Sequence, residues 1–194
     1  MQPLPVISQQ TKPVSIPLTV EWVIPRIAKK VEGLNKYYIK RHRHAIKKYK
    51  TGKGPLPSVP EDLVQAGEFF LYPEEPKFGP VVEPQEFLEL LVEGGDFTAE
   101  SLLLTYILLE RFLGSTRLSG LVHFYHLLGI AALTAHKFLE ETGFWYFPEF
   151  SKLSGLEASD LPVMEKLFLE GFEHKLYVSS SEWEFYLTAL GNQE

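Results

Sequence analysis

The chain of 194 residues contains no cysteine. Disulfides, zinc–thiolate sites and thiol nucleophiles are therefore excluded, and we expect an intracellular protein of the nucleus or the cytoplasm. Long apolar runs are also missing, since no stretch of about eighteen residues is free of polar groups, and we expect no membrane span. The first residues, MQPLPVISQQTKPVSIPL, lack the charged start and apolar centre of a secretory signal. The chain has no glycine-rich phosphate loop and no nucleophile elbow, so nothing in it indicates an enzyme.

Charge is distributed unevenly along the chain. Residues 1–58 hold twelve of the 19 Lys and Arg residues but only two of the 25 Asp and Glu residues, although the whole chain has a net charge of −6. Residues 1–25 are rich in proline, and a cluster of glycine and proline interrupts residues 52–60. We therefore predict a Pro-rich lead and basic, partly helical N-terminal arm over residues 1–58, followed by one domain over residues 59–194.

Apolar residues recur at helical spacing through most of the chain, and no useful strand pattern occurs, so the predicted class is all-α. The stretch from Ser119 to Gly143 is apolar around most of its circumference. It should therefore be a central helix surrounded by others, capped by Ser119 and ended by Gly143. A capping box of Ser181 and Glu184 should start the last helix. The other helices are predicted over about residues 26–50, 84–94, 98–114, 147–153 and 160–172.

Three motifs lie in the second, third and fifth helices predicted for the domain. They are LLERFLGS at 108–115, LLGIAALTAHKFLEETG at 127–143 and LPVMEKLFLEGFEHKLYV at 161–178. In this order and spacing they resemble a cyclin box, with its core at about residues 83–178. A single box with little after it is similar to the phosphate-pathway (P/U-type) cyclins of fungi and protists. The resemblance implies a five-helix bundle with a flanking C-terminal helix.

Members of the cyclin family have no catalytic residues in the box and bind and activate a cyclin-dependent protein kinase. The resemblance thus implies a non-enzymatic subunit of a kinase heterodimer, with no cofactor. Matched by motif, Lys137 and Glu165 would bond to the kinase beside the helix that the family repositions. Phe138, Leu169 and Leu176 would form an apolar socket for that helix. Spacing alone favours an ordinary salt bridge between helices for Lys137 and Glu165. The match to the cyclin motifs reverses that preference in favour of kinase binding.

The chain departs from the family pattern at two positions. Leu90 stands where many members have an arginine that pairs with the acidic residue of the second helix, which is Glu110 here. Glu110 therefore needs another partner, and Arg111 is a candidate. His174 stands where an aromatic socket residue is common, and neighbouring aromatic residues are candidates to replace it.

The basic arm allows more than one reading. Its charged run contains Lys40, Arg41, Arg43, Lys47 and Lys48. These side chains could contact nucleic acid, anionic lipid or an import receptor, but we favour a solvated helix face or a contact with the acidic domain of the same molecule. Nucleic acid is thus the less favoured partner. It belongs to a rival function, a cyclin-fold adaptor that recruits a transcription or nucleic-acid complex through the arm.

The histidines raise the question of a metal. His123, His126 and His136 fall on one predicted helix, but no carboxylate lies at matching spacing on its face. A metal site needs three or four converging ligands. We therefore predict partly buried, hydrogen-bonded histidines and no metal.

Overall fold

The computed structural model describes residues 18–52, 70–72, 83–116, 121–139 and 147–192. Their regular secondary structure is helical apart from two short strands, β1 (Leu71–Tyr72) and β2 (Leu121–Val122), which pair antiparallel. The predicted all-α class is therefore confirmed. Within the same ranges no helix is both long enough and apolar enough to cross a membrane.

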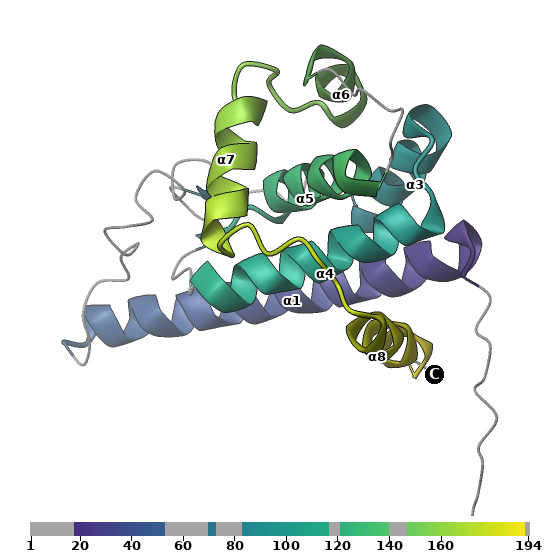
Figure 1. Ribbon diagram of the computed structural model, residues 1–194. Helices are drawn as coiled ribbons and strands as arrows, with labels where there is room; N and C mark the ends of the chain where they lie inside the picture. The colour runs from purple at the N-terminus through teal and green to yellow at the C-terminus, as the bar shows by residue number, and fades with distance from the viewer. Residues whose placement is uncertain (1–17, 53–69, 73–82, 117–120, 140–146, 193–194) are drawn as a thin grey trace, which may run out of the picture.

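The helices pack in layers around α4. In chain order the described residues form α1 (Val20–Lys50), α3 (Pro84–Gly95), α4 (Ala99–Thr116), α5 (Phe124–Leu139), α6 (Phe147–Ser154), α7 (Leu161–Gly171) and α8 (Ser180–Gly191). The long helix α1 packs against α3 and α4, and α4 packs against α5. In the view of Figure 1, α1 and α8 lie at the bottom and α5, α6 and α7 lie above them. This arrangement separates the surface of α1 from the surface formed by α5 and α7.

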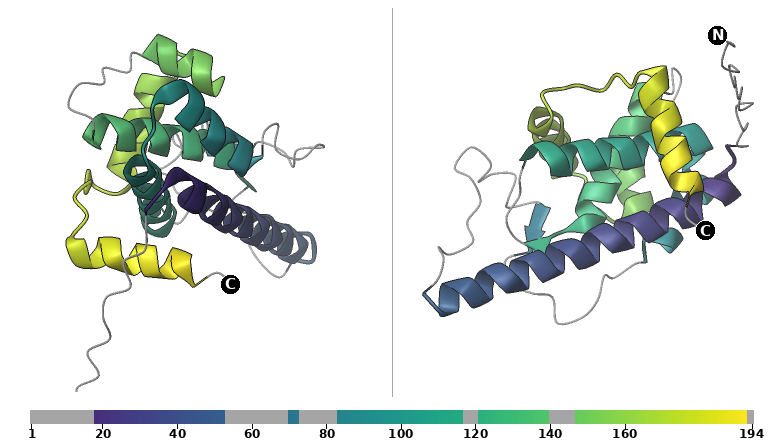
Figure 2. Two further views of the ribbon diagram at one scale, coloured as in Figure 1. Left: turned by 90° about the vertical axis from the view of Figure 1, so that its right-hand side faces the viewer. Right: turned by 90° about the horizontal axis from the view of Figure 1, so that it is seen from below.

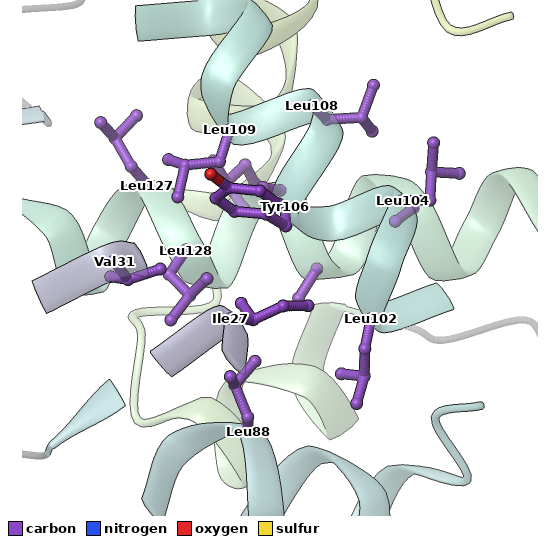
Figure 3. Packing of buried hydrophobic residues seen from close by; sticks show 14 of the residues in the cluster. Ile27, Val31, Leu88, Leu102, Leu104, Tyr106, Leu108, Leu109, Leu127 and Leu128 are labelled. Carbon is purple, nitrogen blue, oxygen red and sulfur yellow. The ribbon is translucent and has the colours of Figure 1, made fainter. Parts of the chain in front are cut away.

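The core is centred on α4 and α5. Ten consecutive residues of α5, 127–136, are buried, as expected for a helix that is apolar on all sides. Small residues allow the neighbouring segments to come close: a Cβ added at Gly129 would lie 2.7 Å from a methyl carbon of Leu156. Figure 3 shows the resulting packing, with Ile27 of α1 lying among Leu88 of α3 and Leu128 of α5.

The start of α5 differs from the prediction. The helix begins at Phe124, and Ser119 and Gly143 lie outside the described residues. Tertiary pairing causes the difference, because β2 is held extended against β1 and the N–H of His123 donates to the carbonyl of Phe70 at 2.8 Å. The Nδ1 atom of His123 then accepts the N–H of His126 at 3.3 Å, which caps the helix.

The start of α1 also differs from the prediction. The helix begins at Val20 and includes Pro25, although residues 1–25 were expected to be extended. A proline inside a helix removes one backbone hydrogen bond. Burial of apolar residues on either side offsets that cost, and these are Val23, Ile24, Ile27, Ala28 and Val31. The first half of α1 is thus part of the core rather than an arm apart from it, and the boundary expected at residue 58 lies outside the described residues.

The remaining helices start within two residues of their predicted positions. Thr98 caps α4 as expected, since its hydroxyl accepts the N–H of Ser101 at 3.2 Å. The cap of α8 was assigned wrongly to Ser181. The hydroxyl of Ser179 accepts the N–H of Glu182 at 3.3 Å, so Ser179 is the cap. The helix therefore starts two residues earlier than predicted, at another serine that is followed three residues later by a glutamate.

Candidate functional site

The strongest candidate site is an ion pair between α5 and α7. The Nζ atom of Lys137 lies 2.8 and 2.7 Å from the two carboxylate oxygens of Glu165. Lys137 is the first exposed residue after the buried part of α5, and Glu165 lies one turn inside α7. The ammonium group also lies 5.0 Å from the centre of the Phe147 ring at the start of α6. From the end of α5, this one lysine therefore contacts side chains of both α6 and α7.

The pair keeps hydrogen-bonding capacity for a partner. The side chain of Glu165 is 14% exposed and that of Lys137 is 38% exposed, so the pair lies at the surface with its carboxylate largely covered. A carboxylate offers about four acceptor positions and an ammonium three donors, and their mutual contact uses only part of both. A neighbouring protein could therefore bond its own backbone groups to Lys137 and Glu165 without breaking the pair.

Apolar side chains lie on the same two helices as the ion pair. Phe138 follows Lys137 and is 48% exposed, and Leu139 after it is also exposed. Leu169 lies one helical turn after Glu165 and is partly buried. Phe138 and Leu139 thus expose two consecutive apolar side chains beside the charged pair, where another protein could bury them.

A tight turn after α7 carries Leu176 back towards α8. Glu173 and His174 have φ angles of 57° and 58°, in the left-handed region that residues other than glycine rarely adopt. The N–H of His174 donates to the carbonyl of Leu169 at 2.8 Å, and the N–H of Leu176 donates to that of His174 at 2.9 Å. These bonds position Leu176, which is partly buried against the core.

Arg111 on α4 holds this turn in place. Its guanidinium donates to the carbonyls of Lys175 at 2.5 Å and Tyr177 at 2.9 Å, and to the Glu182 carboxylate at 2.7 Å. Sequence reasoning missed this role and considered Arg111 as a partner for Glu110. No pattern could have revealed it, because two of the acceptors are backbone carbonyls more than sixty residues along the chain.

The two positions that depart from the cyclin pattern, Leu90 and His174, are both exposed. Leu90 is exposed on α3, and Glu110 accepts a hydrogen bond from the Tyr106 hydroxyl of its own helix. His174 is exposed on the turn after α7. Of its aromatic neighbours, Phe172 is buried beneath the surface, whereas Tyr177 is 77% exposed beside Leu176.

The basic residues form a separate surface. All five predicted contacts lie on the second half of α1 and are exposed: Lys40, Arg41, Arg43, Lys47 and Lys48. The second half of α1 reaches past the end of α4, whereas α5 and α7 lie above α4 in the view of Figure 1. The structure therefore does not bring these side chains together with Lys137 and Glu165.

The histidines occupy buried or capping positions. The rings of His123 and His126 stack with their centres 3.5 Å apart, and burial, followed by the charge of His126, lowers the pKa of His123 to about 4. His136 is buried and stacks on Phe97 at 4.4 Å. In the described parts of the chain, no group of three or more His, Cys, Asp or Glu side chains could hold a metal ion.

Comparison with known proteins assigns no family to the chain. No family model matches it, and no curated protein matches it significantly. Inferences about function therefore depend on the residues and geometry described above.

Proposed function

We propose that the protein is a single-box cyclin of the P/U type, a non-catalytic subunit that binds and activates a cyclin-dependent protein kinase. The observation that carries the proposal is the bidentate contact of Lys137 with Glu165 between α5 and α7. The cyclin-like motifs assign these two residues to kinase binding, and they meet at the surface beside exposed Phe138.

The apolar residues and the ion pair would have different roles in such a complex. Burial of Phe138, Leu169 and Leu176 against a kinase helix would supply most of the binding free energy. The Lys137–Glu165 pair would fix the orientation of that helix through bonds to its backbone. An oriented helix is what activation requires, because its glutamate must reach the lysine that binds ATP in the kinase.

The test is co-expression of the tagged full-length protein with the cyclin-dependent kinase subunits of its source organism. Complex formation and kinase activity are then measured for the parent and for the Lys137→Ala/Glu165→Ala variant. Leaving one or two partner groups unpaired costs about 1–3 kcal/mol each, so we expect the variant to bind at least about tenfold more weakly. Phe138→Ala should weaken binding as well, because it removes an exposed apolar contact.

A matched control is available on α7. Lys166 and Glu170 form an exposed pair at 3.8 Å on the same helix, and the Lys166→Ala/Glu170→Ala variant should bind the kinase as the parent does. If the Lys137–Glu165 pair were only an internal bridge, its removal would change the free energy of unfolding by about 1 kcal/mol or less and leave binding intact. A folded Lys137→Ala/Glu165→Ala protein that activates the kinase like the parent would therefore refute the proposed site.

A further inference from the structure

A groove between α1 and α4 lies away from the proposed kinase surface. It has a volume of about 480 Å³ and is lined by Lys29, Lys30, Leu34, Tyr37, Tyr106 and Glu110. Tyr37 is 57% exposed, and its ring packs edge-on against Tyr38 at 5.3 Å. Two lysines and an exposed aromatic ring thus lie at one opening.

Basic residues continue from this groove along the exposed surface of α1. With 3.6 residues per turn, Lys30, Tyr37, Arg41 and Lys48 lie on one face of the helix, because they are separated by seven, four and seven residues. A second row, about a third of a turn further round the helix, contains Lys36, Lys40, Arg43, Lys47 and Lys50, all exposed. The helix has no acidic residue after Glu32, and its last turns extend beyond the end of α4 (Figures 1 and 2).

We propose that this surface binds single-stranded nucleic acid, with phosphates along the basic rows of α1 and one unpaired base stacked on Tyr37 in the groove. Proteins that bind single strands combine these two features, a positive surface that follows the backbone and an aromatic ring that stacks on a base. From Tyr37 to Lys48 the helix rises by about 16 Å, which is enough for several phosphates.

The lining of the groove favours a base over a phosphate. The Glu110 carboxylate, which accepts the Tyr106 hydroxyl, lies at the groove and would repel a phosphate there. A carboxylate can instead accept a hydrogen bond from a donor on an unpaired base, either an amino group or the ring N3–H of thymine. Phosphates are thus directed to Lys29 and Lys30 at the groove and to the basic rows beyond it.

The exposed side of α1 does not suit a membrane surface. Helices that lie in a lipid interface present several large apolar residues towards the lipid. Tyr37 is the only exposed large apolar residue among the described side chains of α1. The groove lies between α1 and α4, whereas Lys137 and Glu165 pair on α5 and α7, so the inference is independent of kinase binding.

The experiment measures fluorescence anisotropy of a labelled single-stranded oligothymidylate of about sixteen nucleotides with the full-length protein. If about four phosphates are contacted, affinity should fall about fiftyfold between 50 and 200 mM salt. Tyr37→Ala should weaken binding about tenfold without changing the salt dependence, because stacking carries no charge. Arg41→Glu/Lys48→Glu should weaken binding by more than about tenfold and make the salt dependence shallower.

The control variant reverses the charge of two exposed lysines on other helices. Lys152→Glu on α6 with Lys166→Glu on α7 gives the same change in net charge and should leave affinity within about twofold of the parent. Circular dichroism melts confirm that each variant is folded. The proposal is overturned if Tyr37→Ala binds like the parent, or if a duplex of equal length binds as tightly as the single strand. It is also overturned if the control loses as much affinity as the α1 variant, or if vesicles containing phosphatidylserine bind more tightly than the oligonucleotide.

Discussion

Replacing Ile27 by alanine should lower the free energy of unfolding by about 2–5 kcal/mol. Ile27 is fully buried on the inner face of α1, between α3 and α5 (Figure 3). With Val23, Ile24 and Val31 it forms an apolar face of four buried side chains. At about 1.5–3 kcal/mol each, their burial contributes up to about 6–12 kcal/mol, an upper estimate. The whole stability of a domain is about 5–15 kcal/mol, so this face decides whether the protein folds.

The measurement is chemical denaturation followed by far-ultraviolet circular dichroism. Ile39→Ala is the matched control, because it removes the same atoms from the same helix where the side chain is only partly buried, and it should cost less than half as much. A chain that begins at residue 53 lacks α1 and should show no cooperative transition. If Ile27→Ala changed stability by less than about 0.5 kcal/mol, or if the shortened chain unfolded like the parent, the buried position of α1 would be refuted.

Three further substitutions test the local structure. The pKa of His123 is about 4 in the folded protein and near 6.5 in the unfolded chain. Between pH 6.5 and pH 4 only the unfolded chain therefore protonates the His123 ring. The free energy of unfolding should fall as the pH drops through this range. His123→Asn keeps a capping acceptor for the N–H of His126 and should remove this part of the pH dependence in denaturation curves; an unchanged curve would refute the assignment. Gly171→Ala should cost about 1–3 kcal/mol in thermal or chemical melts, since its Cβ would lie 2.4 Å from the Phe112 ring. Gly33→Ala, with nothing within 4 Å, should instead stabilise α1 by up to about 1 kcal/mol, and equal effects of the two changes would contradict the packing.

Local patterns in the sequence were sufficient to predict that each of the described helices exists, but not where every helix begins. The apolar residues between Ser119 and Gly143 predicted a helix surrounded by others, and residues 127–136 of that helix are all buried. The same approach assigned the wrong first residue to α5 and α1. At α5 a pairing with β1 keeps the preceding residues extended, and at α1 the core accepts a helical turn before Pro25. In both cases the residues that decide where the helix begins are distant from it in the chain.

The candidate site, like the fold, could be predicted only in part from the sequence. Motif spacing was enough to predict that Lys137 and Glu165 belong together, and the structure places them in contact. Only the tertiary structure shows that Phe147 lies against the same lysine and that Arg111 fixes the turn after α7. Helical periodicity is a property of residues three and four apart, so it can be read from the sequence. The contacts of Arg111 join residues more than sixty apart, including backbone carbonyls that every residue possesses, and therefore only the folded chain selects them.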